Sequence, residues 1–203
     1  MNKNNYTVWH KGSLTKQDRN RLNGHDSGVI WFTGLSASGK STIAHAVEKE
    51  LFQKGIRAYV LDGDNIRHGL TSDLGFSTED RKENIRRIAE VARLFVDAGI
   101  IVLTAFITPL ESQRKFARSR FQDLKFIEVY VKCPLEECIR RDPKGLYEKA
   151  LSGAIENYTG ISAPFEEPEK SDLVLDTEKR GIDESVSTVL DHLEKIDFLK
   201  LSE

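Results

Sequence analysis

The stretch that decides the fold is Gly34-Leu35-Ser36-Ala37-Ser38-Gly39-Lys40-Ser41, which matches the pattern G-x-x-x-x-G-K-[ST]. An apolar run at residues 29–33 predicts a strand before it, and residues 41–54 predict a helix after it that stops at Gly55. Between a strand and a helix, glycines let backbone N–H groups converge on phosphate oxygens, and the helix N-terminus adds its positive dipole end. The sequence therefore predicts a phosphate-binding P-loop rather than an ordinary glycine-rich turn.

Two side chains of this loop indicate a nucleoside triphosphate with magnesium. Lys40 is placed to reach the β- and γ-phosphates, and the Ser41 hydroxyl can bind Mg²⁺. The sequence lacks an Asn-Lys-x-Asp motif for guanine, which favours ATP as the nucleotide. P-loops serve motors, GTPases, transporters and small-molecule kinases, so the loop predicts the phosphate donor and leaves the acceptor open.

Further along the chain, short β-rich runs alternate with helical patterns. The remaining predicted strands are residues 58–61, 100–107, 126–131 and 173–175. A long helix is predicted between the second and third strands, capped by Ser77 with Asp80 at the third position and ended by Gly99. Shorter helices are predicted at residues 134–141 and 183–193. Strands interleaved with helices predict an α/β fold with three layers around a five-stranded, mainly parallel sheet.

The composition is that of a folded protein of one domain. The chain has 203 residues, 39% of them hydrophobic and 31% charged, and a formal net charge of -2. Such a balance provides no broad field for nucleic acid or a membrane surface, so an anionic ligand must bind in a local pocket. The chain starts with a polar stretch, and its longest apolar run, residues 100–107, is far too short to span a bilayer. We therefore expect a cytoplasmic protein.

Within the chain we expect an N-terminal arm at residues 1–27 and one domain at residues 28–203. Residues 142–170 contain Gly, Pro and charged residues with little apolar periodicity, which in a compact domain is typical of a functional lid. Cys133 and Cys138 lie close together without metal-ligand spacing or a nearby His partner. We expect them to be buried or spare thiols.

A second group of polar residues follows the predicted strand at residues 58–61. Asp62, Asp64 and Arg67 should lie at the carboxyl edge of the sheet, where the P-loop also lies. One carboxylate can hold magnesium through water while the other orients or deprotonates an attacking hydroxyl. The alternative is that Asp64 only caps the short helix that follows. We expect the donor and acceptor sites to adjoin.

Cationic and aromatic side chains follow this group. Arg67, Arg81 and Asn84 offer donors suited to a substrate with its own phosphate or sulfate group, although an isolated surface Arg is usually only solvated. Phe76 precedes the helix that bears Arg81 and can stack on a base, although its spacing is equally compatible with a position in the core.

These motifs closely resemble those of adenylylsulfate kinases, which transfer the γ-phosphoryl group of ATP to the 3′-hydroxyl of adenylyl sulfate. The resemblance spans nearly the whole chain and rests on residues 8–10, 34–42, 61–69, 74–77, 80–87, 141–147 and 158–161. It implies a P-loop kinase fold and a role in sulfate assimilation. It also implies a homodimer and a functional link to a sulfate adenylyltransferase.

The resemblance further implies the residues of the site. ATP would be bound by Gly34, Leu35, Ser36, Ala37, Ser38, Gly39, Lys40, Ser41 and Thr42, with Arg141 near the donor. Adenylyl sulfate would be bound by Asp64, Arg67, Phe76, Arg81, Asn84, Ile107, Thr108, Lys144 and Tyr158, with Phe76 and Tyr158 on the two faces of adenine. Catalysis would depend on Lys40, Asp64 and Lys144, with magnesium held by Ser41 and Asp62.

Two positions depart from the family pattern. Tyr158 stands where the family usually has Phe, a change that keeps a ring for stacking. Thr108 stands where the family usually has a Ser that is described as a phosphorylated intermediate. No residue near Thr108 in the sequence looks like a dedicated base for it, so we expect direct in-line transfer without a covalent step. The alternative functions are another P-loop small-molecule kinase and a noncatalytic ATP-sensing module.

Overall fold

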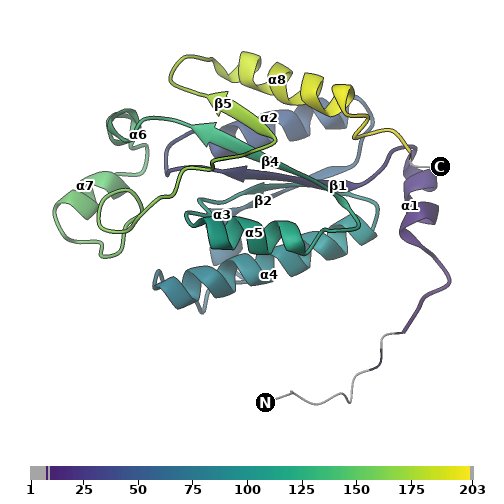
Figure 1. Ribbon diagram of the computed structural model, residues 1–203, viewed down its shortest axis with the longest axis horizontal. Helices are drawn as coiled ribbons and strands as arrows, with labels where there is room; N and C mark the ends of the chain where they lie inside the picture. Colours follow the sequence, from purple (N-terminus) through teal and green to yellow (C-terminus); the bar gives the residue numbers. More distant parts are fainter. Residues whose placement is uncertain (1–7, 9, 202–203) are drawn as a thin grey trace.

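The computed structural model describes residue 8 and residues 10–201, and its centre is one parallel sheet (Figure 1). The sheet has five strands in the order β2-β3-β1-β4-β5, and each neighbouring pair is parallel. The strands are β1 (Gly28–Thr33), β2 (Ala58–Asp62), β3 (Ile101–Ala105), β4 (Lys125–Lys132) and β5 (Leu173–Asp176). The predicted α/β fold is confirmed.

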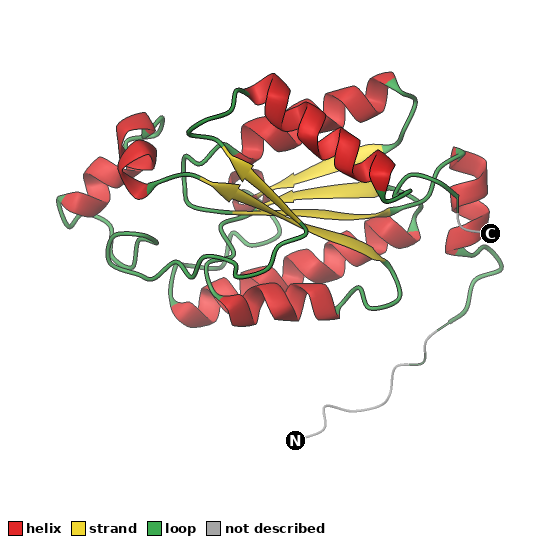
Figure 2. Cartoon of the chain, turned by 45° about the horizontal axis from the view of Figure 1, so that its top comes forward, coloured by secondary structure: helices red, strands yellow, loops and turns green. Residues whose placement is uncertain are grey.

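Helices cover both faces of the sheet and complete three layers (Figures 1 and 2). The helices are α1 (Lys16–Asn23), α2 (Lys40–Gln53), α3 (Gly63–Arg67), α4 (Thr78–Asp97), α5 (Glu111–Ser119), α6 (Leu135–Arg141), α7 (Leu146–Leu151) and α8 (Ile182–Lys195). Helices α2 and α8 lie on one face, and α4 and α5 lie on the other. The predicted arm at residues 1–27 lies partly outside the described residues, and its described part includes α1.

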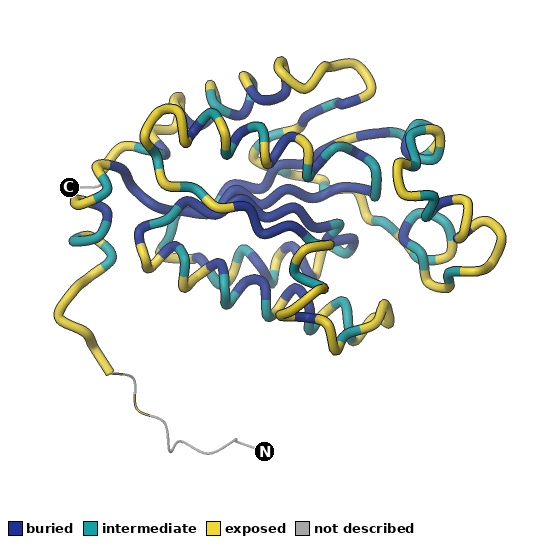
Figure 3. Tube along the Cα trace, turned by 180° about the vertical axis from the view of Figure 1, so that it is seen from behind, coloured by how far each residue is buried: buried dark blue, intermediate teal, exposed yellow. Residues whose placement is uncertain are grey.

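Alternation along β1 divides the core between the two faces of the sheet. Val29 and Trp31 pack into the cluster on the α4 side, whereas Ile30 and Phe32 pack into the cluster on the α2 side. Successive side chains of a strand point to opposite faces, so a continuous apolar run serves both layers. Figure 3 shows the central strands buried along their length. The sheet is therefore a rigid base for the loops at its edge.

The third strand is shorter than the sequence predicts, because the expected strand at residues 100–107 ends at Ala105. Phe106 and Ile107 continue the apolar run but leave the sheet, and Thr108 has a backbone φ of 43°, which no strand adopts. The prediction was wrong at this point, since hydrophobicity alone does not report the turn.

Two local predictions near the site also need correction. The cap of α3 is Asp62, whose carboxylate accepts a hydrogen bond from the Asp64 N–H, so the alternative that Asp64 caps this helix is wrong. The expected lid at residues 142–170 contains the helix α7, which its weak apolar periodicity did not predict. The Asp142 carboxylate accepts hydrogen bonds from the N–H groups of Leu146 and Glu148 and stabilises the start of this helix.

Among the helices that the structure describes, none combines the length and the apolar character that a membrane span requires.

Candidate active site

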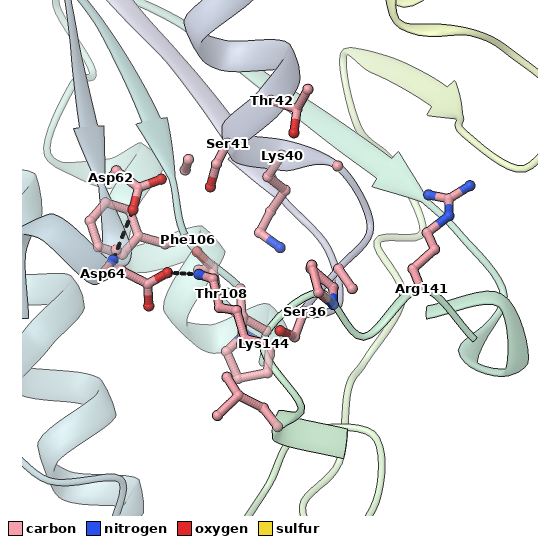
Figure 4. A pocket seen from close by; sticks show the side chains of 18 of the residues that line it. Ser36, Lys40, Ser41, Thr42, Asp62, Asp64, Phe106, Thr108, Arg141 and Lys144 are labelled. Atoms are coloured by element: carbon pink, nitrogen blue, oxygen red, sulfur yellow. Dashed lines mark hydrogen bonds and ion pairs between the residues drawn. The ribbon is translucent and has the colours of Figure 1, made fainter. Parts of the chain in front are cut away.

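A pocket of about 770 Å³ lies at the carboxyl edge of the sheet (Figure 4). Its walls come from the P-loop, the end of β2 with α3, the start of α4, the turn after β3 and residues 141–158. All the strands end at this edge because they are parallel, so segments that are far apart in the sequence meet there.

The P-loop follows β1 and folds tightly against β4. Gly34 and Gly39 have φ values of 149° and 104°, a region that favours glycine. A Cβ atom on Gly34 would lie 2.5 Å from the Val131 carbonyl oxygen, so this position admits no side chain. The pattern of glycines in the motif therefore has a steric cause in this chain.

Lys40 is the first residue of α2, and its side chain turns back over the loop. Its Nζ donates hydrogen bonds to the Leu35 carbonyl at 2.5 Å and to the Ser38 hydroxyl at 3.5 Å. Burial lowers the pKa of the Lys40 ammonium to about 8, although the charges of Asp62 and Asp64 oppose this shift. A phosphate chain bound to the loop would give this buried cation an oppositely charged partner.

Ser41 and Asp62 place a hydroxyl and a carboxylate in the same pocket (Figure 4). Asp62 is 7% exposed, and one of its two carboxylate oxygens accepts the hydrogen bond from Asp64. A hydroxyl and a carboxylate fit Mg²⁺, which binds oxygen and usually takes its other ligands from water and substrate phosphates. These two side chains fit the predicted ion.

Asp64 and Lys144 form an ion pair that joins the two sides of the pocket (Figure 4). Asp64 belongs to the first turn of α3, and Lys144 precedes α7 in the expected lid segment. Both side chains are more than half exposed, so the pair is accessible to a bound molecule. The sequence predicted both residues for the site but did not predict that they bind each other.

Arg67 and Arg81 surround Phe76 on the wall formed by α3 and α4. The Arg67 guanidinium lies 4.2 Å from the centre of the Phe76 ring and donates to the Leu74 carbonyl at 3.1 Å. Arg81 donates to the Phe76 carbonyl at 3.0 Å and to the Asn157 carbonyl at 2.7 Å. Phe76 is 54% exposed, so the alternative of a core position is wrong. This wall offers two cations and an accessible aromatic ring.

Asn84 lies deeper in the same wall, one turn of α4 beyond Arg81. It is 7% exposed, and its amide oxygen has no hydrogen-bond partner among the residues that the structure describes. A buried polar atom without a partner is costly, so a ligand that donates a hydrogen bond would stabilise it.

Tyr158 closes the pocket from the lid side. Its ring packs edge-on against Tyr147 with 5.1 Å between the ring centres, and the Tyr147 hydroxyl donates to the Ser36 carbonyl at 3.1 Å. Burial raises the pKa of Tyr158. The segment that provides Tyr158 is therefore in direct contact with the P-loop.

Arg141 and Thr177 hold the outer side of the P-loop. Arg141 donates to the Thr177 carbonyl at 2.7 Å, and the Thr177 hydroxyl donates to the Ser38 carbonyl at 2.8 Å. The sequence prediction missed Thr177, although a hydroxyl residue directly after a strand at this edge is a usable signal. Arg180 also lines the pocket and was missed.

The pocket brings together every predicted site residue outside the P-loop. Of the P-loop residues, Ser36, Ala37, Gly39, Lys40, Ser41 and Thr42 line it. Three other residues of the loop do not line the pocket: Gly34, Leu35 and Ser38. Of these, Leu35 packs with the buried, free thiols Cys133 and Cys138. These three residues shape the loop from the inside.

Comparison with known proteins gives one consistent result. A family model described as adenylylsulphate kinase matches residues 26–176. The chain is 61% identical over 183 residues to a probable adenylyl-sulfate kinase of Halalkalibacterium halodurans, covering 90% of this chain and 88% of that protein. It is 54% identical over 199 residues to an adenylyl-sulfate kinase of Staphylococcus epidermidis, covering 98% of this chain and 100% of that protein.

A solved structure agrees with these relatives. The structure is similar, with a TM-score of 0.81 and 51% sequence identity, to the APS kinase of Mycobacterium tuberculosis in complex with AMPPNP and APS. The match covers 83% of this chain and 98% of that chain.

Proposed function

The chain belongs to the adenylylsulphate kinase family, and from that premise we propose that it transfers the γ-phosphoryl group of ATP to the 3′-hydroxyl of adenylyl sulfate. The observation that supports this acceptor is the junction of two surfaces in one pocket. The P-loop meets a wall with two guanidinium groups, an accessible ring and the unpartnered amide oxygen of Asn84. Such a wall suits a nucleotide with an anionic group.

On the donor side, the P-loop amides and Lys40 would bind the phosphate chain. The Lys40 ammonium would leave the Leu35 carbonyl for the β- and γ-phosphate oxygens, where it meets opposite charge in a poorly solvated site. Magnesium held by Ser41 and Asp62 would offset negative charge on those oxygens. Arg141 would bind near the donor through its place beside Thr177.

On the acceptor side, Asp64 and Lys144 would exchange their mutual ion pair for contacts with the substrates. Asp64 would hold the 3′-hydroxyl in line with the γ-phosphorus, and Lys144 would stabilise charge on the moving phosphoryl group. Phe76 and Tyr158 would contact the adenine ring, and Arg67, Arg81 and Asn84 the polar groups. A closed lid at residues 142–170 would exclude water, which competes as a phosphoryl acceptor.

One assay tests this function against its alternatives. ADP release is measured with ATP, magnesium and adenylyl sulfate, and then with sugar acids or nucleosides in place of adenylyl sulfate. The Lys40→Met variant gives the background from contaminating ATPase. We expect turnover with adenylyl sulfate to exceed all others. Faster turnover with another acceptor would identify a different small-molecule kinase, and no ADP with any acceptor would favour an ATP-sensing module.

A further inference from the structure

The turn at residues 106–109 lines the pocket and is attached to β1 and to the P-loop. The Ile107 carbonyl accepts a hydrogen bond from the Thr33 hydroxyl at 2.7 Å and another from the Gly34 N–H at 3.3 Å. Gly34 is the first glycine of the P-loop. A shift of this turn would therefore disturb the relative placement of the donor and acceptor sides.

Arg114 fixes the next two carbonyl groups of the turn from below. Its guanidinium donates to the Thr108 carbonyl at 3.1 Å and to the Pro109 carbonyl at 3.3 Å. Arg114 is 3% exposed and pairs with Glu128 on β4 at 3.5 Å. A buried guanidinium with a buried carboxylate partner has little freedom to move, so the carbonyl side of the turn is held by the core.

The N–H groups of the turn, unlike its carbonyl groups, are not held by the core. Within the described chain, neither the Ile107 N–H nor the Thr108 N–H has a hydrogen-bond partner, and both residues line the pocket. Neighbouring backbone N–H groups without partners can bind an anion when they converge on one point. Their direction depends on the backbone conformation at Thr108.

That conformation is one that a threonine rarely adopts. Thr108 has a φ of 43°, in the left-handed region where a β-branched side chain is strained, and it is 1% exposed. Its hydroxyl oxygen accepts a hydrogen bond from the Trp31 indole N–H at 3.0 Å. The Trp31 side chain is fully buried on β1, with ring centres 6.3 Å from Phe106 and 6.0 Å from Phe126. The core of the sheet thus holds the strained residue by its side chain.

We propose that Trp31 is a positioning residue for the substrate that accepts the phosphoryl group. The role of the Thr108 hydroxyl is then to accept the hydrogen bond of the Trp31 indole N–H, and it does not carry the phosphoryl group. The pair holds the turn so that the amides of Ile107 and Thr108 are presented to adenylyl sulfate. This inference rests on the proposed function. The hydroxyl is buried and already bonded to Trp31, and no carboxylate or imidazole among the described residues hydrogen-bonds to it as a base.

The test compares variants that remove the hydrogen bond with one that retains it. Trp31→Phe removes the donor, Thr108→Val removes the acceptor with nearly the same volume, and Thr108→Ser retains it. Phe121→Leu, which disturbs the same core cluster away from the turn, is the matched control. For each variant, kcat and the KM values for ATP and adenylyl sulfate are measured with the thermal unfolding midpoint.

We expect kcat/KM for adenylyl sulfate to fall about tenfold in Trp31→Phe and in Thr108→Val, as loss of one hydrogen bond predicts. The KM for ATP should not change, Thr108→Ser should retain activity, and Phe121→Leu should lower only the unfolding midpoint. The double variant should fall no further than either single variant, because both remove the same interaction.

Several results would overturn the proposal. One is an equal rise of both KM values, and another is an additive loss in the double variant. The third is label on Thr108 after incubation with γ-labelled ATP without acceptor. The proposed function fails separately, when the unaltered protein does not turn over adenylyl sulfate. If the unaltered protein is active and Trp31→Phe matches it, only the positioning role is wrong.

Discussion

At the scale of single residues, the exposed ion pair between Asp64 and Lys144 connects the two halves of the site. Exposed pairs contribute little to stability, because solvent screens them and both side chains lose conformational entropy. Under the proposed function, each side chain can therefore leave the ion pair for a substrate at little cost in free energy. The free carboxylate can then hold a hydroxyl, and the free ammonium can meet a phosphoryl group.

This role of Asp64 predicts a selective loss in Asp64→Asn. We expect kcat to fall by about a hundredfold or more, since the amide is a poor proton acceptor, while nucleotide binding is retained. Kinetics with ATP and adenylyl sulfate give kcat, and calorimetry with an ATP analogue gives the affinity. Asp191→Asn, at an exposed position of α8, is the control. Near-normal turnover in Asp64→Asn would exclude Asp64 from catalysis.

The depressed pKa of Lys40 predicts how ATP binding depends on pH. Burial lowers this pKa to about 8, so in the free protein the ammonium loses its proton as the pH rises through that value. Phosphate binds the protonated form, so the affinity for an ATP analogue should weaken between about pH 8 and pH 10 with proton uptake on binding. Calorimetry in buffers of different ionisation enthalpy measures both. The same pH dependence in Lys40→Met would assign it to another group.

At the scale of elements, the sequence predicts what local pattern determines. Parallel strands that are buried on both faces are recognisable as short apolar runs, so all the strands were located. Helix α7 was not predicted because its side chain Tyr147 packs on the P-loop, which is distant in the sequence. Such a contact leaves no apolar periodicity within the helix itself. Asp62 and Asp64 lie at the end of a predicted strand and could be found from the pattern, whereas Lys144 and Tyr158 were found only through the family resemblance. The pairings of Lys144 with Asp64 and of Trp31 with Thr108 join positions 80 and 77 residues apart and could not be predicted.

Helix α4 presents Arg81 and Asn84, and its first turn depends on a local cap. The Ser77 hydroxyl accepts a hydrogen bond from the Asp80 N–H at 3.1 Å and donates to the Asp80 carboxylate at 2.9 Å. Ser77→Ala should lower the free energy of unfolding by about 1 kcal/mol, measured by urea denaturation. Ser187→Ala, at an exposed position inside α8, is the control and should not destabilise. An equal effect of both changes would contradict the capping role.

At the scale of the whole molecule, residues 142–170 are attached to four walls of the pocket. Lys144 binds Asp64, Tyr147 binds the P-loop, and the Asn157 carbonyl accepts from Arg81 on α4. The Glu166 N–H donates to the Pro109 carbonyl at 2.8 Å, which ties the far end of the segment to the turn after β3. These four contacts are polar, and the apolar packing of the segment is confined to a small cluster around Tyr147, in contrast to the large apolar clusters on the sheet. Segments held in this way open at a lower free energy than the core.

Hydrogen exchange should therefore identify this segment as the lid. In the free protein we expect amides at residues 142–161 to exchange much faster than those of β1 and β3, and to slow when an ATP analogue and adenylyl sulfate bind together. Lys144→Met should weaken this protection because it removes the contact with Asp64, whereas Lys149→Met, at an exposed position of α7, should not. Mass spectrometry of peptides from the labelled protein resolves both regions. Equal exchange with and without both ligands would show that the segment is a fixed wall of the pocket, and water would then have to be excluded by the substrates themselves.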